Sequence, residues 1–489
     1  MVSSLSVPTL RRQASLYSFE SYAMSKNKSG NDFLPVLNPT RSFWIDSPDA
    51  NPLAKEGSKG HLPQETDVCI IGSGITGIST AYHLSTQARD RPLNVVILEA
   101  RDFCSGATGR NGGHLTPAVF IDFCNFKARY GQQEALKAFE LEHHTEKSIL
   151  NFVSSHNLEQ TVDLVPGGHI TVFVTNEELM RAREDFAAAG AAGINPLNVE
   201  WLTSEEMLLA YGVSYPGCRI GGHNLWPLKL VTHLYHHAKS QTSSVSLSLF
   251  TSAVVTSITR AEPSSSHRWK ITSPRGSTTC SYVIHANNAY APSLLPHLRG
   301  PSGIIPTRGQ IVAVRAAVPS DELGDGKPSW DANDGFEYWF PRPVTSPLEC
   351  PLFILGGGRE AEEQFEHGEI DDSKLSANAG TSLRRFLPCL YPGKFEEGRG
   401  PEMEWTGIMG FTLSEDPFVG PVGGYDVPDD EDTGYKGQFI AAGYSGHGMP
   451  RAYACAEVVA AMVSADLRGE KWNAPNWLPR HYLTSRIEK

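Results

Sequence analysis

The chain lacks the features that mark membrane, nucleic-acid-binding or disulfide-rich proteins. No apolar run reaches the roughly 18 residues that a spanning helix needs. Its 42 Lys and Arg face 54 Asp and Glu, a net charge of −12 with no basic tract. We therefore expect neither nucleic acid nor an anionic membrane surface as a partner. The 8 cysteines include no C-x-x-C pair, so we expect no metal site and no disulfide framework, and a reducing compartment.

The length of 489 residues predicts two or three domains around a sizeable core. Residues 1–40 are expected to be a flexible N-terminal extension. The first 30 residues are Ser-rich and carry Arg11 and Arg12 with one acid, Glu20, a pattern that faintly resembles a mitochondrial presequence. The plainer alternatives are a disordered extension or a true start at Met24. We predict a cytoplasmic protein, with a mitochondrial location as the alternative.

The most informative motif is V-C-I-I-G-S-G-I-T-G at positions 68–77. A short apolar, β-branched run predicts a buried strand, and Gly72, Gly74 and Gly77 follow with the G-x-G-x-x-G spacing of a dinucleotide-binding βαβ unit. The first glycine permits the tight turn, the second lets the backbone approach a pyrophosphate, and the third allows close helix packing. The N-terminus of the following helix, with its free N–H groups, would face the phosphates.

An acidic residue supports this interpretation. The apolar run Val95–Leu98 ends in Glu99, 22 residues after Gly77, where a carboxylate can accept hydrogen bonds from a ribose diol. Such a carboxylate would repel a 2′-phosphate, which favours FAD or NAD over NADP. The alternative is a βαβ unit that binds nothing.

A second junction between a strand and a glycine-rich turn lies near the C-terminus. The run Gln438–Ala442 predicts a strand, G-Y-S-G-H-G-M follows at 443–449, and an Ala-rich helix begins near Arg451. A helix N-terminus approached by glycines again suits an electron-rich ligand. Its distance from the first junction predicts a discontinuous nucleotide domain.

The remaining pattern predicts a mixed α/β protein. Apolar periodicity predicts helices over 132–155, from Asn176 to about 190, and from Pro227 to 239. Strands are expected at 168–174, 282–286, 311–314, 338–340 and 351–356, with a β pair at 253–258 and 269–272. Residues 320–335 and 360–374 are expected to be polar, acidic loops.

Five segments together resemble one family. They are D-V-C-I-I-G-S-G-I-T-G (67–77), L-E-A-R (98–101), S-G-A-T-G-R-N-G-G-H (105–114), T-R-G-Q (307–310) and A-A-G-Y-S-G-H-G-M (441–449). The chain resembles the D-amino-acid-oxidase-like FAD-dependent oxidoreductases, the superfamily of glycine and sarcosine oxidases, and within it the γ-glutamylputrescine-oxidase-like branch. The resemblance spans about residues 41–480.

This resemblance implies an FAD site. The pyrophosphate, the adenosine and the flavin ring would each be held by one or more of these segments. The residues that it assigns to cofactor binding are Gly72, Ser73, Gly74, Ile75, Thr76, Gly77, Glu99, Ala100, Arg101, Arg110, Asn111, Gly112, Gly113, His114, Val254, Val255, Gly446, His447, Gly448 and Met449.

One position departs from a related pattern. Dimethylglycine-dehydrogenase-like enzymes place a flavin-linking His where this chain has Arg110, and His114 lies four residues later. We therefore expect FAD to be bound noncovalently.

The resemblance also suggests catalytic candidates. Arg342, in Y-W-F-P-R at 338–342, occupies the place of an arginine that pairs with a substrate carboxylate in amino-acid-oxidising relatives. Tyr338 would form a wall of the pocket, and His447 would contact the flavin. The plainer alternatives are a surface charge for Arg342, a core aromatic for Tyr338 and a contact through the backbone alone for His447. Arg359, after three glycines, is a second candidate for the carboxylate, with an ordinary solvated role as the alternative.

These observations predict an α/β fold with a discontinuous Rossmann-like FAD-binding domain (60–165, 227–300 and 400–480) and a mixed-sheet substrate domain (166–226 and 301–399). The predicted reaction is FAD-dependent oxidation of a C–N bond of an amine or amino acid by hydride transfer to the flavin, with oxygen as acceptor. The alternatives are a dehydrogenase with another acceptor, an enzyme acting on a non-amine small molecule in a specialised biosynthetic pathway, and a flavin-binding module without turnover.

Overall fold

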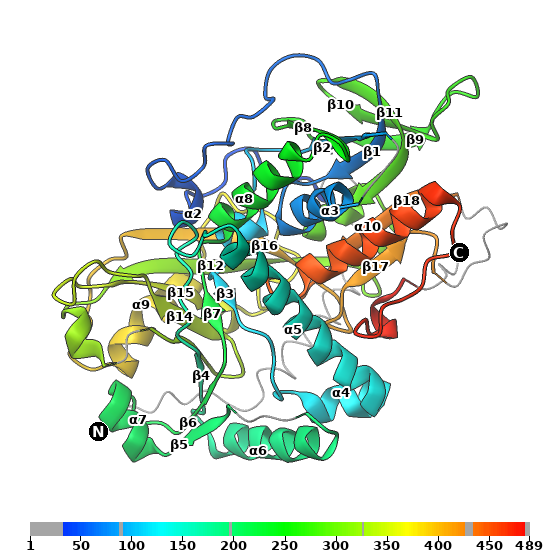
Figure 1. Cartoon of the computed structure of the whole chain (residues 1–489). Coiled ribbons are helices and arrows are strands. Elements are labelled where there is room, and N and C mark those ends of the chain that lie inside the picture. Colours follow the sequence, from blue (N-terminus) through cyan, green and yellow to red (C-terminus); the bar gives the residue numbers. More distant parts are fainter. Residues whose placement is uncertain (1–32, 88–90, 195–197, 325–326, 426–433, 485–489) are drawn as a thin grey trace.

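Two eight-stranded sheets form the framework of the molecule. The computed structural model describes residues 33–87, 91–194, 198–324, 327–425 and 434–484, so most of the expected N-terminal extension lies outside the described residues. Within these residues, no helix is both long and apolar enough to span a membrane. Figure 1 shows the first sheet at the top and the second at the lower left, with the chain passing between them several times.

The first sheet has the strand order β17-β18-β11-β1-β2-β8, and a hairpin, β9–β10, joins it through β11. The neighbours from β18 to β8 run parallel, whereas β17 and the hairpin pair antiparallel. Its strands are β1 (Glu65–Ile71), β2 (Leu93–Leu98), β8 (Val245–Phe250), β9 (Ser257–Arg260), β10 (Trp269–Ser273), β11 (Gly276–His285), β17 (Phe418–Pro421) and β18 (Gln438–Ala442).

Three helices cover one face of this sheet: α3 (Ile75–Ser85), α8 (Pro227–Ser240) and α10 (Ala452–Arg468). Helix α3 lies between the other two and packs against both. Strand β1 is buried along most of its length because it is flanked by parallel neighbours and covered by helices. The resulting core includes the fully buried Ile70, Ile78 and Ile284.

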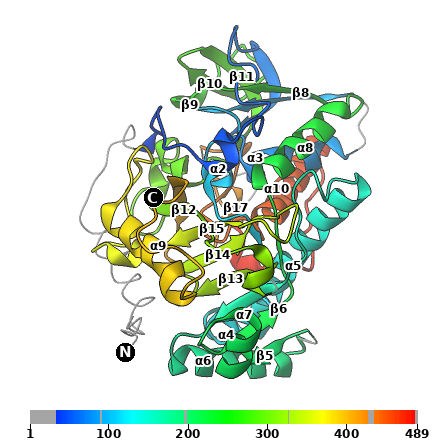
Figure 2. The same cartoon turned by 90° about the vertical axis from the view of Figure 1, so that its left-hand side faces the viewer.

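The second sheet has the order β16-β12-β15-β14-β13-β4-β6-β5. Only β4 and β13 pair in parallel, so the sheet is mixed, as the sequence predicts. Its strands are β4 (His169–Val172), β5 (Glu200–Leu202), β6 (Gly217–Ile220), β12 (Ile305–Arg315), β13 (Ser329–Ala332), β14 (Glu337–Pro341), β15 (Leu352–Gly357) and β16 (Met403–Phe411). Helix α9 (Ala377–Leu390) packs on β12 and β15 and lies on the outer side of the sheet in Figure 2.

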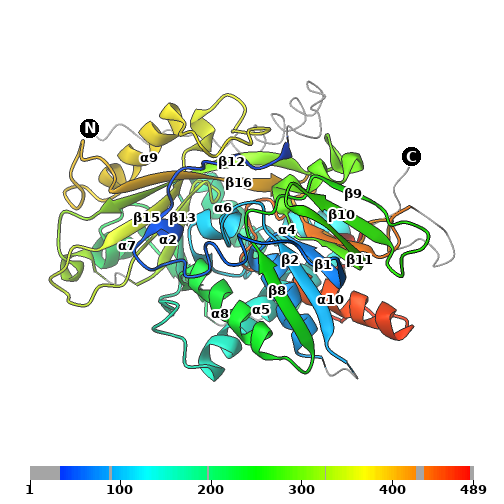
Figure 3. The ribbon, with the colours of Figure 1, turned by 90° about the horizontal axis from the view of Figure 1, so that it is seen from above.

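The remaining α-helices and a small two-stranded sheet lie around the two large sheets. They are α2 (Phe43–Asp46), the small β3–β7 sheet (His114–Leu115 and His223–Asn224), α4 (Phe123–Tyr130), α5 (Gln132–Ser155), α6 (Asn176–Ala191) and α7 (Ser204–Tyr211). Seen from above in Figure 3, the two sheets lie on opposite sides of the molecule, and the loops after β1 and β2 point toward the region between them.

Three expectations differ from the structure. Strand β16 pairs along its whole length with β12, so the predicted FAD segment from residue 400 begins with a strand of the second sheet. Strand β13 lies inside 320–335, which was expected to be a loop, because its pairing with β4 and β14 outweighs its polar composition. Residues 33–40, expected to be part of a flexible extension, are attached at both ends: Phe33 is buried and the Thr40 amide donates to the Asp372 carbonyl.

Candidate cofactor and active site

A cavity of about 600 Å³ lies between the two sheets. The loops that follow β1, β2 and β11, and the turn after β18, form one side of it, and β13 to β16 of the second sheet contribute the other. Ligands of open parallel sheets bind beyond the carboxyl ends of the strands, and this volume falls in the range of cofactor sites. The predicted cofactor residues that line the cavity are Gly72, Gly74, Ile75, Thr76, Glu99, Ala100, Arg101, Arg110, Asn111, Gly112, Gly113, His114, Val254, Val255, Gly446, His447, Gly448 and Met449.

The glycine turn after β1 has the geometry of a phosphate cradle. Gly72 has a φ of +105°, which excludes ordinary side chains, and Gly74 is the N-cap of α3. The Ile75 amide donates to Thr108 Oγ1 at 3.0 Å, so the loop at 105–113 closes over the start of the helix. Gly77 does not line the cavity; a Cβ there would overlap the Gly72 carbonyl, so its role is close packing of α3 on the turn.

Ser73 also lies off the cavity wall and instead orients Glu99. Its amide and hydroxyl donate to Glu99 Oε2 at 3.0 and 2.7 Å, and the Arg101 amide donates to Oε1 at 3.0 Å. The carboxylate is therefore fixed at the end of β2 with acceptor capacity left for a ribose diol. The Ser73 amide and hydroxyl are thus both engaged with Glu99.

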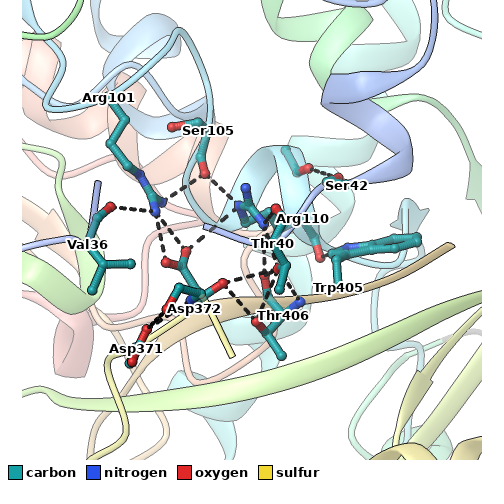
Figure 4. A network of polar contacts seen from close by, with 12 residues as sticks. Val36, Thr40, Ser42, Arg101, Ser105, Arg110, Asp371, Asp372, Trp405 and Thr406 are labelled. Atoms are coloured by element: carbon teal, nitrogen blue, oxygen red, sulfur yellow. Dashed lines mark hydrogen bonds and ion pairs between the residues drawn. The ribbon is translucent and has the colours of Figure 1, made fainter. Parts of the chain in front are cut away.

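The side chain of Arg110 lies in a buried polar network behind the cavity (Figure 4). Its Nε donates to the Ser105 carbonyl at 2.9 Å, and Nη1 donates to the carbonyls of Thr40 and Thr406 at 2.7 and 3.0 Å. Burial lowers the pKa of Arg110 to about 10, with Asp372 opposing that shift. The guanidinium thus joins the N-terminal arm, the 105–113 loop and β16, which leaves the backbone of Arg110 to line the cavity.

Arg101 and Asp372 complete this network (Figure 4). Arg101 Nη1 lies 2.9 Å from both carboxylate oxygens of Asp372, and Arg110 Nε lies 3.8 Å from Oδ2. Burial acts to lower the pKa of Arg101, but Tyr290 and Asp372 outweigh it and leave that pKa raised. Two buried guanidinium groups therefore share one carboxylate beside the cavity, an arrangement that favours an anionic ligand nearby.

The turn at Gly446–Met449 lies at the start of α10 and lines the cavity. His447 Nε2 is 3.1 Å from Glu142 Oε2, and Arg451 Nε donates to Glu142 Oε1 at 2.8 Å. Burial acts to raise the pKa of Glu142, but His447 and Arg451 hold it at about 2. Glu142 therefore stays ionised and ties the turn to α5.

Tyr338 faces the same cavity from β14. Its ring lies against Gly112 and Gly356, and a Cβ on Gly112 would come within 2.7 Å of the ring. The ring centroid of His114 is 5.6 Å away, and burial lowers the pKa of His114 to about 4, so this imidazole is neutral at pH 7. The loop after Arg110 thus needs glycine because a tyrosine of the opposite sheet packs directly on it.

Arg342 does not belong to the site. It is absent from the cavity wall, and its guanidinium is ion-paired with Asp163 and lies 5.1–5.7 Å from the ring centroids of Phe43, Trp44 and Trp226. The predicted contact of Arg342 with a substrate carboxylate has no support in its position, because its charge is paired with Asp163 outside the cavity.

Arg359 lines the cavity instead. Its guanidinium carbon lies 5.4 and 5.1 Å from the ring centroids of Phe336 and Phe411, and Nη1 donates to the Phe365 carbonyl at 3.3 Å. Within the described part of the chain, no carboxylate lies within ion-pair distance of Arg359. Burial lowers its pKa, and such an arginine is stabilised by an anion entering the cavity.

Sequence reasoning missed several cavity residues, including His169, Asn288, Asp331, Met409 and Arg451. Strand alternation could have pointed to His169, which lies on the predicted strand at 168–174. Asp331 was hidden in a segment expected to be a loop. In the described ranges, no group of three or more His, Cys, Asp or Glu side chains is arranged to hold a metal ion.

The Rossmann-type turn, the fixed Glu99 and the second glycine turn define a dinucleotide-binding protein of the α/β class. Residues 67–462, most of the chain, match the family model DAO, FAD dependent oxidoreductase. The protein belongs to this family of FAD-dependent oxidoreductases. The predicted family, fold class, enzyme class and FAD cofactor are therefore confirmed.

Relatives cover nearly the whole chain. The chain is 25% identical over 434 residues to gamma-glutamylputrescine oxidoreductase of Escherichia coli (strain K12), covering 85% of this chain and 87% of that protein. Its fold is similar to glycine oxidase from Geobacillus kaustophilus (TM-score 0.61, 20% identity, 87% of this chain and all of that one). It is also similar to L-amino acid deaminase from Proteus myxofaciens in complex with anthranilate (TM-score 0.63, 17% identity, 93% and 98% coverage).

Proposed function

We propose that the protein oxidises a C–N bond of a carboxylate-bearing amine or amino acid, with oxygen as the final electron acceptor. Bound FAD supplies the two-electron acceptor for this oxidation. The observation that carries the proposal is Arg359, a cavity-lining guanidinium without an ion-pair partner among the described residues. The names of the relatives, a glutamylputrescine oxidoreductase, a glycine oxidase and an amino acid deaminase, support substrates of this class.

In this proposal the protein's own groups orient the substrate. Arg359 holds the carboxylate, and Phe336 and Phe411 flank the guanidinium and limit the water around it. Tyr338 packs on Gly112 and so sets the distance between the second sheet and the cofactor loop. None of these groups is a base, which agrees with a reaction in which the neutral amine is the reacting form.

The cofactor would be held without a covalent bond. The residue at the position of the flavin-linking His of related enzymes is Arg110, whose guanidinium is engaged with three carbonyls behind the cavity. The pyrophosphate would meet the α3 N-terminus and the backbone of the loop at 110–113. Acid precipitation is expected to release all yellow colour into the supernatant; colour retained on the protein would contradict this expectation.

The decisive experiment is an anaerobic screen of the purified yellow protein against amines, amino acids and polyamines, followed by flavin absorbance. We expect a carboxylate-bearing amine to bleach the flavin, and admission of air to restore the colour with release of peroxide. Failure of every amine to bleach it would contradict the proposed chemistry. Bleaching without reoxidation by air would leave the C–N oxidation intact and contradict oxygen as the acceptor.

Arg359 is tested by comparing a substrate with its methyl ester. Arg359→Met is expected to raise KM for the carboxylate form by roughly 10²-fold or more, as expected for a lost charge-assisted pair, and to leave the ester nearly unchanged. Arg342→Met is the matched control, since this arginine lies outside the cavity. It is expected to lower the stability of the protein without changing the ratio of the KM values for the acid and its methyl ester. An equal rise for acid and ester in Arg359→Met would refute the assignment.

A further inference from the structure

The wall of the cavity opposite the cofactor loops carries a second charged group, on β13. Asp331 and His169 both line the cavity, together with Tyr338 and Arg359. In the sheet, Asp331 is paired with Tyr338 of β14 on one side and with Thr171 of β4 on the other. The proposed mechanism uses neither Asp331 nor His169.

The two carboxylate oxygens of Asp331 have different surroundings. Oδ1 is inaccessible and lies 3.2 Å from His169 Nε2. The side chain as a whole is 25% exposed. A Cβ on the cavity-lining Gly335 would be 3.7 Å from Oδ2, so this oxygen lies beside another residue of the cavity wall. Across the described ranges, no residue donates a hydrogen bond to Oδ2, and no Lys or Arg lies within ion-pair distance of the carboxylate.

His169 lies between Asp331 and Ser329. Its ring is buried, and Nδ1 is 2.9 Å from Ser329 Oγ while Nε2 faces Asp331. Both ring nitrogens are thus directed at protein groups. Asp331 Oδ1 has no hydrogen-bond partner among the described residues, so the carboxylate beside the cavity keeps acceptor capacity for a cationic group.

We propose that Asp331, positioned by His169, is a cation-binding subsite for the substrate. The substrate would then carry, besides the nitrogen that is oxidised and the carboxylate held by Arg359, a second cationic group such as an ammonium or guanidinium. This inference rests on the proposed function for the part that concerns Arg359.

The sheet sets the separation of the strands that carry the two charged groups. Asp331 on β13 and Gly356 on β15 both pair with Tyr338, so their backbones are two strand spacings apart, roughly 10 Å. Arg359 follows β15 after Gly358. Tyr338 lies between the two charged groups, so a chain that spans them would cross the face of this ring.

Binding of a non-substrate probe separates this subsite from turnover. The probe is 4-guanidinobutanoate, which has a carboxylate and a cation but no oxidisable amine, and its matched partner is pentanoate. Anaerobic titration of the FAD-loaded enzyme, followed by perturbation of flavin absorbance, is expected to show at least tenfold tighter binding of the guanidino acid. Asp331→Asn, which keeps the side chain's size, should remove that preference and leave the Kd of pentanoate unchanged.

Asp334→Asn is the matched control, because this cavity carboxylate is already ion-paired with Arg181. It should keep the preference for 4-guanidinobutanoate over pentanoate.

His169→Phe should weaken this preference, and His169→Gln, which retains a donor, should restore part of it. Equal binding of the two acids by the wild-type enzyme, or an unchanged preference in Asp331→Asn, would overturn the proposal. Preferential binding of the guanidino acid without reduction by any amine would instead contradict the proposed function and leave the subsite standing.

Discussion

Removing the charge of Asp372 should destabilise the protein more than any conservative change at its surface. Asp372 is fully buried and is the carboxylate shared by Arg101 and Arg110, whose side chains are 6% and 3% exposed. Asp372→Asn keeps the size of the side chain and leaves the carbonyl of this residue free to accept from Thr40 and Thr406 as before. The substitution therefore isolates the charge.

The expected loss follows from the cost of an unpaired buried ion. Breaking a buried ion pair by removing one partner costs about 3–5 kcal/mol, because the remaining charge stays desolvated. In Asp372→Asn, both guanidinium groups would lose the carboxylate with which they are ion-paired and would keep neutral hydrogen-bond partners. We expect the free energy of unfolding to fall by about 3–5 kcal/mol.

The adjacent residue provides a matched control. Asp371 is paired with Lys374 at 2.9 Å, but that lysine side chain is 73% exposed, and such surface pairs are worth about 0–1 kcal/mol. Urea unfolding of the FAD-loaded protein, followed by far-UV circular dichroism, should therefore separate Asp372→Asn clearly from Asp371→Asn. Losses within about 0.5 kcal/mol of each other would refute the reasoning. Adding Arg110→Met to Asp372→Asn should cost less than the two single changes together, since it removes one of the unpaired charges.

Two further predictions concern the cofactor loop and the pH dependence of stability. Gly112→Ala would drive a Cβ into the Tyr338 ring, so it should raise the Kd for FAD at least tenfold, as measured by fluorescence titration of the apoprotein. Gly106→Ala is the control, because its Cβ would meet no protein atom within 4 Å, and it should leave that Kd unchanged. Equal effects of the two substitutions would contradict the packing of Tyr338 on Gly112. Burial lowers the pKa of His114 and His285 to about 4. Between pH 6.5 and 4 the folded state therefore binds fewer protons than the unfolded state. The free energy of unfolding should fall as the pH falls through this window, by on the order of 1–3 kcal/mol for each histidine. In urea unfolding at pH 7.5, 6 and 5, the free energy of unfolding of His285→Gln should depend less on pH than that of the wild-type protein. An unchanged pH dependence would contradict the role given to His285.

Much of the cofactor side could be predicted from the sequence because its requirements are local. A tight turn that needs a positive φ at Gly72, a helix that begins at once, and an acid at the end of the next strand are all set by residues close together along the chain. The same holds for α5, whose periodicity gave its bounds, and for the α8 start at Pro227.

The charged residues on the side of the cavity opposite the cofactor loops could not be predicted from the sequence, because side-chain direction and long-range strand pairing decide them. Arg342 and Arg359 are both arginines that follow a strand, and only the packed structure shows that the first pairs with Asp163 and the second opens into the cavity. Asp331 belongs to a segment whose composition predicts a loop, and pairing with β4 and β14 makes it a strand.

The sequence by itself determined the glycine turn, the acid that follows the second strand and the family, because these depend on motifs within a few residues of one another. Only the tertiary structure decided how the charges are distributed around the cavity. Asp372 lies 271 residues from Arg101 along the chain, yet their side chains meet at 2.9 Å. Burial makes such pairings strong and selective, and which groups become buried together depends on how the two sheets pack.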